Sequence, residues 1–332
     1  MEYVKDPPQP SETVRGKPLI TICDYGCSQG LNSSAIWIQA VLSKQPNNVN
    51  ARIILQDTPW NDWNSVSQTF RTHFATLSAK SLRTIFPEMA PGSFFEQCLP
   101  DSSIDIGTAW SSAHWLSRDP IPLATDASPE EVLSKFCRHD FEGAHSDLVR
   151  FLKCRARETR PNGIFTACLL AHYTDETNQS TRNQPGLKMA SIMARNQLIE
   201  EGKLSKELTR VVLPCHKRSR EEMEAAFEEV KDDWIVEEMK EDHVVHPAYD
   251  QLVVELKAGM GEEAFRSYAQ KVSTWWIAIV GGMLTKIAMP KETAEAKKIL
   301  DEFTERAAQV FLERSKDEPA MNKFWFLRLR RK

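Results

Sequence analysis

Short apolar runs alternate with amphipathic stretches along the first half of the chain. Three runs have the length and composition of buried strands: 18–23, 51–55 and 104–110. Residues 33–44 and 147–160 carry apolar side chains at helical spacing, and after Pro161-Asn162-Gly163 a further strand is predicted over 164–170. Strands that alternate with helices over short connections predict a parallel sheet covered by helices.

The pattern of the second half is mostly helical. Residues 175–186 are polar and turn-rich, which predicts a linker or loop. Helices are expected over 189–200 and 292–314, and another begins at Ser219, because Glu222 follows it at the spacing of a capping box. The last apolar run, 324–329, predicts a closing strand.

These patterns together predict three regions. Residues 1–171 form an α/β core that binds the cofactor, residues 172–290 a mostly helical cap with the substrate region, and residues 291–332 a long helix and a final strand that return to the core. The expected fold class is therefore α/β, a Rossmann-like sheet with a mostly helical cap subdomain. A chain of 332 residues is long enough for this, since it can bury a large core.

The end of the first predicted strand carries the most informative motif. Asp24-x-Gly26-x-x-x-Gly30 places an acid and two glycines where backbone can approach a ligand beyond the strand. It differs from the Gly-x-Gly-x-x-Gly turn that cradles a pyrophosphate, so it disfavours a nicotinamide oxidoreductase. The motif suits a cofactor without phosphates, of which S-adenosylmethionine is the common one; a plain tight turn is the alternative.

A second acid, Asp57, ends the second predicted strand. In a doubly wound sheet this position is close to the ribose of the cofactor, whose hydroxyls donate well to a carboxylate. The alternative is an ordinary acid in a turn that contains Pro59. The two acids at neighbouring strand ends favour the cofactor interpretation.

Three aromatic segments are further candidates. Ser93 and Phe94 can place a hydroxyl and a ring against an adenine, although a plain turn would look the same. His114 and Trp115 follow the third strand and can donate hydrogen bonds to an acidic substrate; the alternative is a core tryptophan beside a partly exposed histidine. The pair Trp275-Trp276 is better explained by packing within the cap.

Composition narrows the class of protein. The formal net charge is −4, from 42 basic and 46 acidic residues, which offers no electrostatic footprint for nucleic acid. No apolar run reaches the length of a membrane span, and the first 17 residues do not resemble a signal peptide. Seven cysteines without a CxxC motif predict free thiols, with Cys23, Cys98, Cys154 and Cys168 buried, and a cytoplasmic location. No metal is predicted, because zinc-type spacing and HExxH are absent.

Several stretches, in order, resemble the SABATH family of S-adenosylmethionine-dependent carboxyl methyltransferases, which includes salicylate, jasmonate and caffeine-type enzymes. They are the motif from Asp24 to Asn32, the segment 56–64 around Asp57, Pro91-Gly92-Ser93-Phe94-Phe95, His114-Trp115-Leu116-Ser117, and 147–155 with Glu158 and Pro161-Asn162-Gly163. One such motif is a weak signal, whereas five in register are a strong one.

The resemblance implies a role for each matching position. The residues that would line S-adenosylmethionine are Asp24, Gly26, Cys27, Gly30, Asn32, Asp57, Thr58, Ser93 and Phe94. Ser111, His114 and Trp115 would face the carboxyl group of a small acid, the expected partner of the chain, with His114 and Trp115 positioning it. A carboxylate is already ionised at neutral pH, so no general base is required. A homodimer is compatible with the sequence.

The chain also departs from the family pattern. The residues before Asp24 do not reproduce the family's lid segment, and Ser111 replaces a usual aromatic. The positions of the family's magnesium ligands fall on Thr209, Val211 and Val212, so no metal site is expected there. Two alternatives therefore stay open. One is a cofactor-binding protein without turnover, and the other is a small-molecule N- or O-methyltransferase that uses His114 as base.

Overall fold

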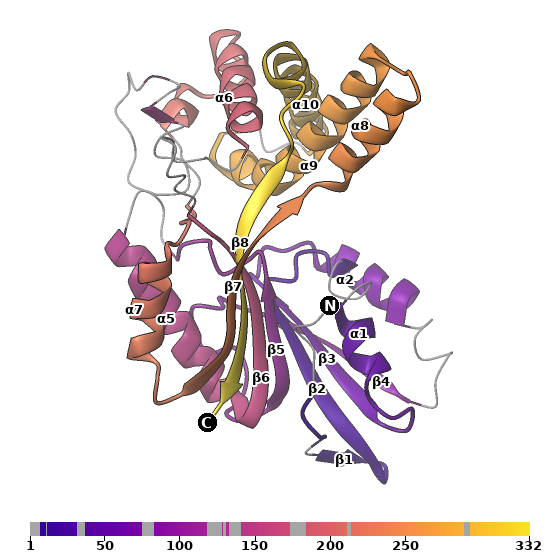
Figure 1. Ribbon diagram of the computed structural model, residues 1–332, viewed down its shortest axis with the longest axis vertical. Coiled ribbons are helices and arrows are strands. Elements are labelled where there is room, and N and C mark those ends of the chain that lie inside the picture. Colours follow the sequence, from indigo (N-terminus) through magenta and orange to yellow (C-terminus); the bar gives the residue numbers. More distant parts are fainter. Residues whose placement is uncertain are drawn as a thin grey trace.

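A mixed sheet forms the centre of the molecule, with helices on both faces and a helical cap beyond one end (Figure 1). The computed structural model describes residues 7–10, 12–31, 37–74, 83–117, 128, 131–132, 141–172, 184–210, 214–288 and 293–332. The α/β fold predicted from the sequence is confirmed.

The strands pair in the order β4-β3-β2-β5-β6-β8-β7, and β1 pairs with β2 beside this path. Their bounds are β1 Glu12–Val14, β2 Lys17–Tyr25, β3 Asn50–Asp57, β4 Ile85–Pro91, β5 Ile104–Trp110, β6 Thr159–Leu170, β7 Trp234–Val245 and β8 Met321–Arg331. The five strands from β4 to β6 are parallel, while β8 is antiparallel to both of its neighbours. The strands expected over 18–23, 51–55 and 104–110 are thus β2, β3 and β5.

The helices lie in the sheet layers and in the cap. Their bounds are α1 Gln39–Ser43, α2 Trp63–Thr69, α5 Phe141–Glu158, α6 Pro185–Glu200, α7 Arg220–Glu229, α8 Pro247–Lys257, α9 Glu262–Ala288 and α10 Thr293–Ser315, with a short π-helix η3 Phe70–Phe74 and a short 3-10 helix η4 Lys206–Arg210. The predicted capping box begins α7: Ser219 Oγ accepts from the Glu222 amide at 3.3 Å, and Glu222 Oε2 accepts from the Ser219 amide at 2.8 Å.

Three strands were not predicted from the sequence: β1, which has only three residues, and the two edge strands β4 and β7. β4 contains two prolines and an acid and is mostly exposed, and β7 has five charged residues among its twelve and is also mostly exposed. The turn expected at Pro161-Asn162-Gly163 is also corrected. α5 ends at Glu158 and β6 begins at Thr159, and these three residues lie inside the strand, where Asn162 takes a φ of 64° beside a shift in pairing register.

Each layer has its own apolar core. α5 and α7 cover one face of the sheet, α1 and α2 the other, and α6, α8, α9 and α10 enclose the third core in the cap. Trp276 is buried in the cap core, as its packing interpretation predicted. Within 172–290, α7 and β7 belong to the sheet layers, whereas α10 packs in the cap against α6 and α9.

β8 runs from the cap to the far end of the sheet (Figure 1). Because β8 is antiparallel to β6, all the parallel strands end at the edge that faces the cap. The residues that follow these strand ends therefore lie between the sheet and the cap.

The six described cysteines are all free thiols, of which Cys23, Cys27, Cys168 and Cys215 are buried. Cys98 and Cys154 are only partly buried, which corrects the sequence prediction. Cys98 lies in a surface loop and Cys154 on the partly exposed side of α5, so each thiol is covered on one side only. None of the described helices combines the length and apolar composition needed to cross a bilayer.

Candidate active site

The strand order reverses between β2 and β5, and this point is where open α/β sheets bind ligands. The glycine turn follows β2 here. The Gly26 and Cys27 amides donate to the Gln56 carbonyl at 2.8 and 3.0 Å, and the Gly30 amide donates to the Cys27 carbonyl at 2.9 Å. The turn is therefore fixed against the end of β3.

Both glycines of the motif are required by close approach as well as by backbone conformation. Gly26 and Gly30 have φ of 77° and 76°, which L side chains rarely adopt. A Cβ on Gly26 would lie 2.3 Å from the Ser112 Cβ and 3.5 Å from the Phe94 ring. A Cβ on Gly30 would lie 2.6 Å from the Leu55 side chain. The turn after β2, the loop after β4 and the segment after β5 thus meet at Gly26.

Asp57 holds this arrangement with its carboxylate. Oδ2 accepts from the Ser28 amide at 2.6 Å, and Oδ1 accepts from the Thr58 amide at 2.7 Å. Each oxygen keeps a second lone pair, and the residue is half-buried, so the carboxylate can still accept from hydroxyls of a ligand. Asp24 is buried at the end of β2, where it is paired with Leu55 of β3 and Thr108 of β5.

The loop that carries Ser93 and Phe94 is fastened to α5 by a buried ion pair. Arg155 donates to the carbonyls of Phe94 at 2.8 Å and Glu96 at 2.9 Å. Its partner Glu158 accepts from the Cys98 amide and from the Tyr25 hydroxyl, both at 2.6 Å. Both charged side chains are fully buried. The ion pair therefore fixes the place of the Phe94 ring relative to β2.

His114 and Trp115 follow β5 and lie against the cap. The His114 carbonyl accepts from the His216 amide at 2.8 Å, and Trp115 is half-buried against the cap core. Burial lowers the pKa of His114 from 6.5 to about 3, and the positive charge of Arg218 adds to this shift. The imidazole is therefore neutral at physiological pH, and its ring centroid lies 5.8 Å from that of Trp115.

The surroundings of Cys27 keep its thiol protonated. Its burial raises its pKa far above the usual range, and the nearby carboxylates of Asp24 and Asp57 add to the effect. Cys27 stays a neutral thiol whose Sγ lies 3.3 Å from the Ser28 carbonyl oxygen.

The structure gathers most of the predicted positions at one edge of the sheet. Thr58, Ser93 and Ser111 are exposed there, and Asn32 lies outside the described residues. Sequence reasoning missed Ser112, whose Oγ donates to the Tyr25 carbonyl at 2.7 Å. It also assigned no role to Arg155, although Arg155 and Glu158 both stand in a segment that carried the resemblance.

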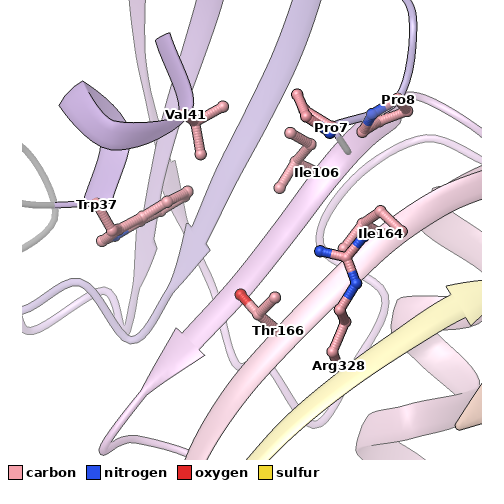
Figure 2. Close-up of a pocket in the computed structure, with 8 residues that line it drawn as sticks. All are labelled: Pro7, Pro8, Trp37, Val41, Ile106, Ile164, Thr166 and Arg328. Atoms are coloured by element: carbon pink, nitrogen blue, oxygen red, sulfur yellow. The ribbon is translucent and has the colours of Figure 1, made fainter. Parts of the chain in front are cut away.

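The pocket in Figure 2 is a different feature. It lies on the face of the sheet under α1, among Trp37, Val41, Ile106 and Arg328, and Ile106 precedes the end of β5. Its interior holds about 10 Å³, no more than a single water molecule needs. It is too small for a nucleoside and does not belong to the strand-end site.

The strand-end site fits a nucleoside cofactor that carries no phosphate. It offers a carboxylate at Asp57, an aromatic ring at Phe94 and a glycine turn closed by Ser112. Neither 24–30 nor 56–62 contains a lysine or arginine that would pair with phosphate. Within the described part of the chain, no three or more His, Cys, Asp or Glu side chains cluster as metal ligands. Thr209 uses its hydroxyl on the Lys206 carbonyl, and Val211 and Val212 lie outside the described residues.

The sequence is similar to known proteins over nearly its whole length. The family described as SAM dependent carboxyl methyltransferase matches residues 12–332. Methyltransferase LUC1 of Fusarium sp is 29% identical over 321 residues, covering 94% of this chain and 85% of the relative. Indole-3-acetate O-methyltransferase 1 of Oryza sativa subsp. japonica is 29% identical over 194 residues, 48% of this chain and 47% of that protein.

A solved structure supports the fold independently. Loganic acid methyltransferase with SAH superposes with a TM-score of 0.66 at 20% identity, covering 99% of this chain and 86% of that chain. This superposition establishes the Rossmann-like fold. The match of the family over residues 12–332 establishes the family. The chain belongs to the S-adenosylmethionine-dependent carboxyl methyltransferases.

Proposed function

We propose that this enzyme forms the methyl ester of a small-molecule carboxylic acid, held between the strand ends and the cap. The observation that carries the proposal is the meeting of the glycine turn, Phe94 and Ser112 at one point, with His114 and Trp115 directly beyond it. Relatives whose names refer to indole-3-acetate, jasmonic acid and gibberellic acid support a small organic acid as acceptor.

Cofactor binding is assigned to the residues after β2, β3 and β4. The proposed set is Asp24, Gly26, Cys27, Gly30, Asn32, Asp57, Thr58, Ser93 and Phe94. Asp57 accepts from the ribose hydroxyls, and the Phe94 ring packs against the base. The substrate set is Ser111, His114 and Trp115. In terms of regions, 1–171 hold the cofactor, 172–290 shape the acid pocket, and 291–332 join the two.

The chemistry asks little of the protein beyond alignment. When bound, S-adenosylmethionine supplies an electrophilic methyl group on a sulfonium. The acid is already ionised at neutral pH and acts as its own nucleophile, so no side chain has to remove a proton. Trp115 donates its indole N–H to one carboxylate oxygen, which leaves the other oxygen directed at the methyl group. The cap core around Trp115 excludes water, and this favours neutralisation of the anion.

Neutral His114 fits a positioning role better than that of a base. A group whose pKa lies near 3 takes a proton poorly from a phenol or an amine. The Nδ1 atom of His114 is buried and has no hydrogen-bond partner within the described part of the chain, so in the tautomer that carries its proton there it can donate to a bound carboxylate. This observation favours ester formation over N- or phenol O-methylation.

The test is incubation of the protein with methyl-labelled S-adenosylmethionine and a panel of small carboxylic acids, each beside its primary amide, together with small phenols and amines. We expect labelled ester from one class of acid and none from the amides. Cofactor binding in calorimetry without any ester would make the chain a binding protein without turnover. Labelled product from the phenols or amines of the panel would favour His114 as a base.

A variant at Trp115 identifies the acid site. Phenylalanine keeps most of the bulk and removes the donor, so Trp115→Phe should lower kcat/KM for the acid by about 1–3 kcal/mol equivalent. Affinity for S-adenosylmethionine should stay the same. Joint loss of cofactor and stability, with acid kinetics unchanged per folded molecule, would make Trp115 a core residue only.

The free thiols of the six described cysteines support a cytoplasmic location, and the net charge of −4 argues against a nucleic-acid partner. A homodimer is compatible with these features, and sedimentation of the pure protein would test it.

A further inference from the structure

Arg218 is a buried charge that the proposed chemistry does not use. Its side chain is among the largest fully buried ones, with 1% of the residue exposed. Nη2 donates to the Ala144 carbonyl at 3.0 Å, and Nη1 makes longer contacts with the carbonyls of Ala113 at 3.4 Å and His216 at 3.5 Å. Within the described part of the chain, main-chain carbonyls are the hydrogen-bond acceptors of this guanidinium.

The two carboxylates whose charge acts on Arg218 are hydrogen-bonded to other groups. Asp147 accepts from the Ser117 amide at 2.7 Å and from its hydroxyl at 2.6 Å. Glu222 accepts from the Ser219 amide at 2.8 Å and faces His216 Nε2 at 3.3 Å. The negative charges of both carboxylates act on Arg218, but neither forms an ion pair with it within the described part of the chain. A buried charge without a direct counter-ion costs several kcal/mol, and an apolar side chain of similar volume would avoid that cost.

The guanidinium joins three pieces of chain at the acid site. Ala113 directly precedes His114, His216 belongs to the segment that pairs with Trp115 through Cys215, and Ala144 lies in the first turns of α5. The segment that contains Ala113 and His114 ends at Ser117, and Asp147 of α5 accepts a hydrogen bond from the Ser117 amide. Segment 112–117 is therefore fixed at both ends, and Arg218 provides one fastening together with a positive charge.

We propose that Arg218 is a positioning residue of the acid site, which fixes His114 and Trp115 and places a positive charge behind them that selects an ionised acceptor. This inference rests on the proposed function. The charge attracts the carboxylate through a medium of low dielectric constant, where it is screened little. A neutral acid derivative gains nothing from it, and the ester product loses the attraction as it forms.

This role affects binding more than turnover. Negative charge on the acid is neutralised on the way to the ester, so a remote positive charge stabilises the bound acid more than the transition state. Its removal should therefore raise KM for the acid with little change in kcat. A purely structural role would lower kcat, because alignment of His114 and Trp115 would be lost.

Two variants separate the charge from the hydrogen bonds. Arg218→Gln keeps a donor for the carbonyls without the charge, and Arg218→Lys keeps the charge with fewer donors. For the best acceptor acid of the panel, we expect Arg218→Gln to raise KM at least tenfold, with kcat within threefold. The ratio of acid to amide affinity, from calorimetry on protein loaded with S-adenosylhomocysteine, should fall by a similar factor. Arg218→Lys should restore most of that ratio, and cofactor affinity should change less than twofold in both variants.

The outcomes are distinguishable. A wild-type protein that esterifies no acid overturns the proposed function and this inference with it. An active wild type whose Arg218→Gln variant keeps its KM and its acid-to-amide ratio overturns only the role of Arg218. Equal loss of acid and amide affinity would make Arg218 structural. If Arg218→Gln does not fold, Arg218→Met replaces it as the neutral variant with the same criteria.

Discussion

The close approach at Gly26 can be tested by adding a single methyl group. In Gly26→Ala the new Cβ would lie 2.3 Å from the Ser112 Cβ and 2.8 Å from its Oγ, well inside van der Waals contact. The φ of 77° adds backbone strain. Strain at positive φ costs about 1 kcal/mol, and overpacking costs about 1–3 kcal/mol. We therefore expect Gly26→Ala to lower the free energy of unfolding by about 2–4 kcal/mol.

Gly202 provides a matched control. It has a φ of 72° and no heavy atom within 4 Å of its would-be Cβ, so Gly202→Ala carries the backbone strain without the overlap. Its cost should be about 1 kcal/mol. The difference between the two variants in urea unfolding isolates the steric part. Gly26→Ala should also weaken S-adenosylmethionine more than tenfold in calorimetry, whereas Gly202→Ala should leave its affinity unchanged.

A second substitution sharpens the assay. Ser112→Gly removes the two atoms that would overlap with the new methyl group, although it also loses the Ser112–Tyr25 hydrogen bond, worth about 1 kcal/mol. The pair Gly26→Ala with Ser112→Gly should thus be less destabilised than the sum of the single variants. Equal costs for Gly26→Ala and Gly202→Ala, or strict additivity with Ser112→Gly, would refute the reasoning.

Four further predictions follow from the site and its supports. Asp57→Ala should weaken S-adenosylmethionine by about 1.5–3 kcal/mol in calorimetry, and unchanged affinity in a folded variant would remove Asp57 from the site. Burial holds the pKa of native His114 at about 3 against 6.5 when unfolded, so the unfolded state binds more protons between these values. The contribution of His114 to the free energy of unfolding should be fully present above pH 6.5 and should fall as pH decreases, by about 1–2 kcal/mol at pH 5.5. His114→Gln should remove this pH dependence. Glu158→Gln leaves Arg155 buried without its counter-ion and should cost about 3–5 kcal/mol in urea unfolding, whereas Glu228→Gln at the exposed pair with Lys231 should leave the midpoint unchanged. A chelator should not reduce methyl transfer, and restoration of lost activity by magnesium would contradict this.

The sequence predicted the parts of the fold whose pattern is local. The apolar runs of β2, β3 and β5, the capping box at Ser219 and the glycine motif after β2 each contain their own signal. β4 and β7 do not, because an edge strand that is exposed on much of its surface needs no apolar periodicity.

The candidate site divides in the same way. Gly26 and Asp57 could be found because strand ends and turn glycines are visible along the chain. Ser112, Arg155 and Arg218 could not, because their roles depend on partners far away in sequence. Arg155 contacts the loop after β4. Arg218 contacts one carbonyl in the segment after β5 and another in α5. A periodicity or a motif carries no information about such pairs.

The position of β8 has a consequence for how the molecule is made. Among the strands that the structure describes, β7 pairs with β8 alone, yet α8, α9 and α10 are synthesised between the two. Until residues 321–331 leave the ribosome, β6 and β7 both present open edges, and the fully buried site of Trp325 between them is empty. Pairings of such long sequence separation form late. The nascent chain therefore cannot close its sheet before it has produced its cap, and we expect the two halves of the active site to be gained in folding, and lost in unfolding, as one event.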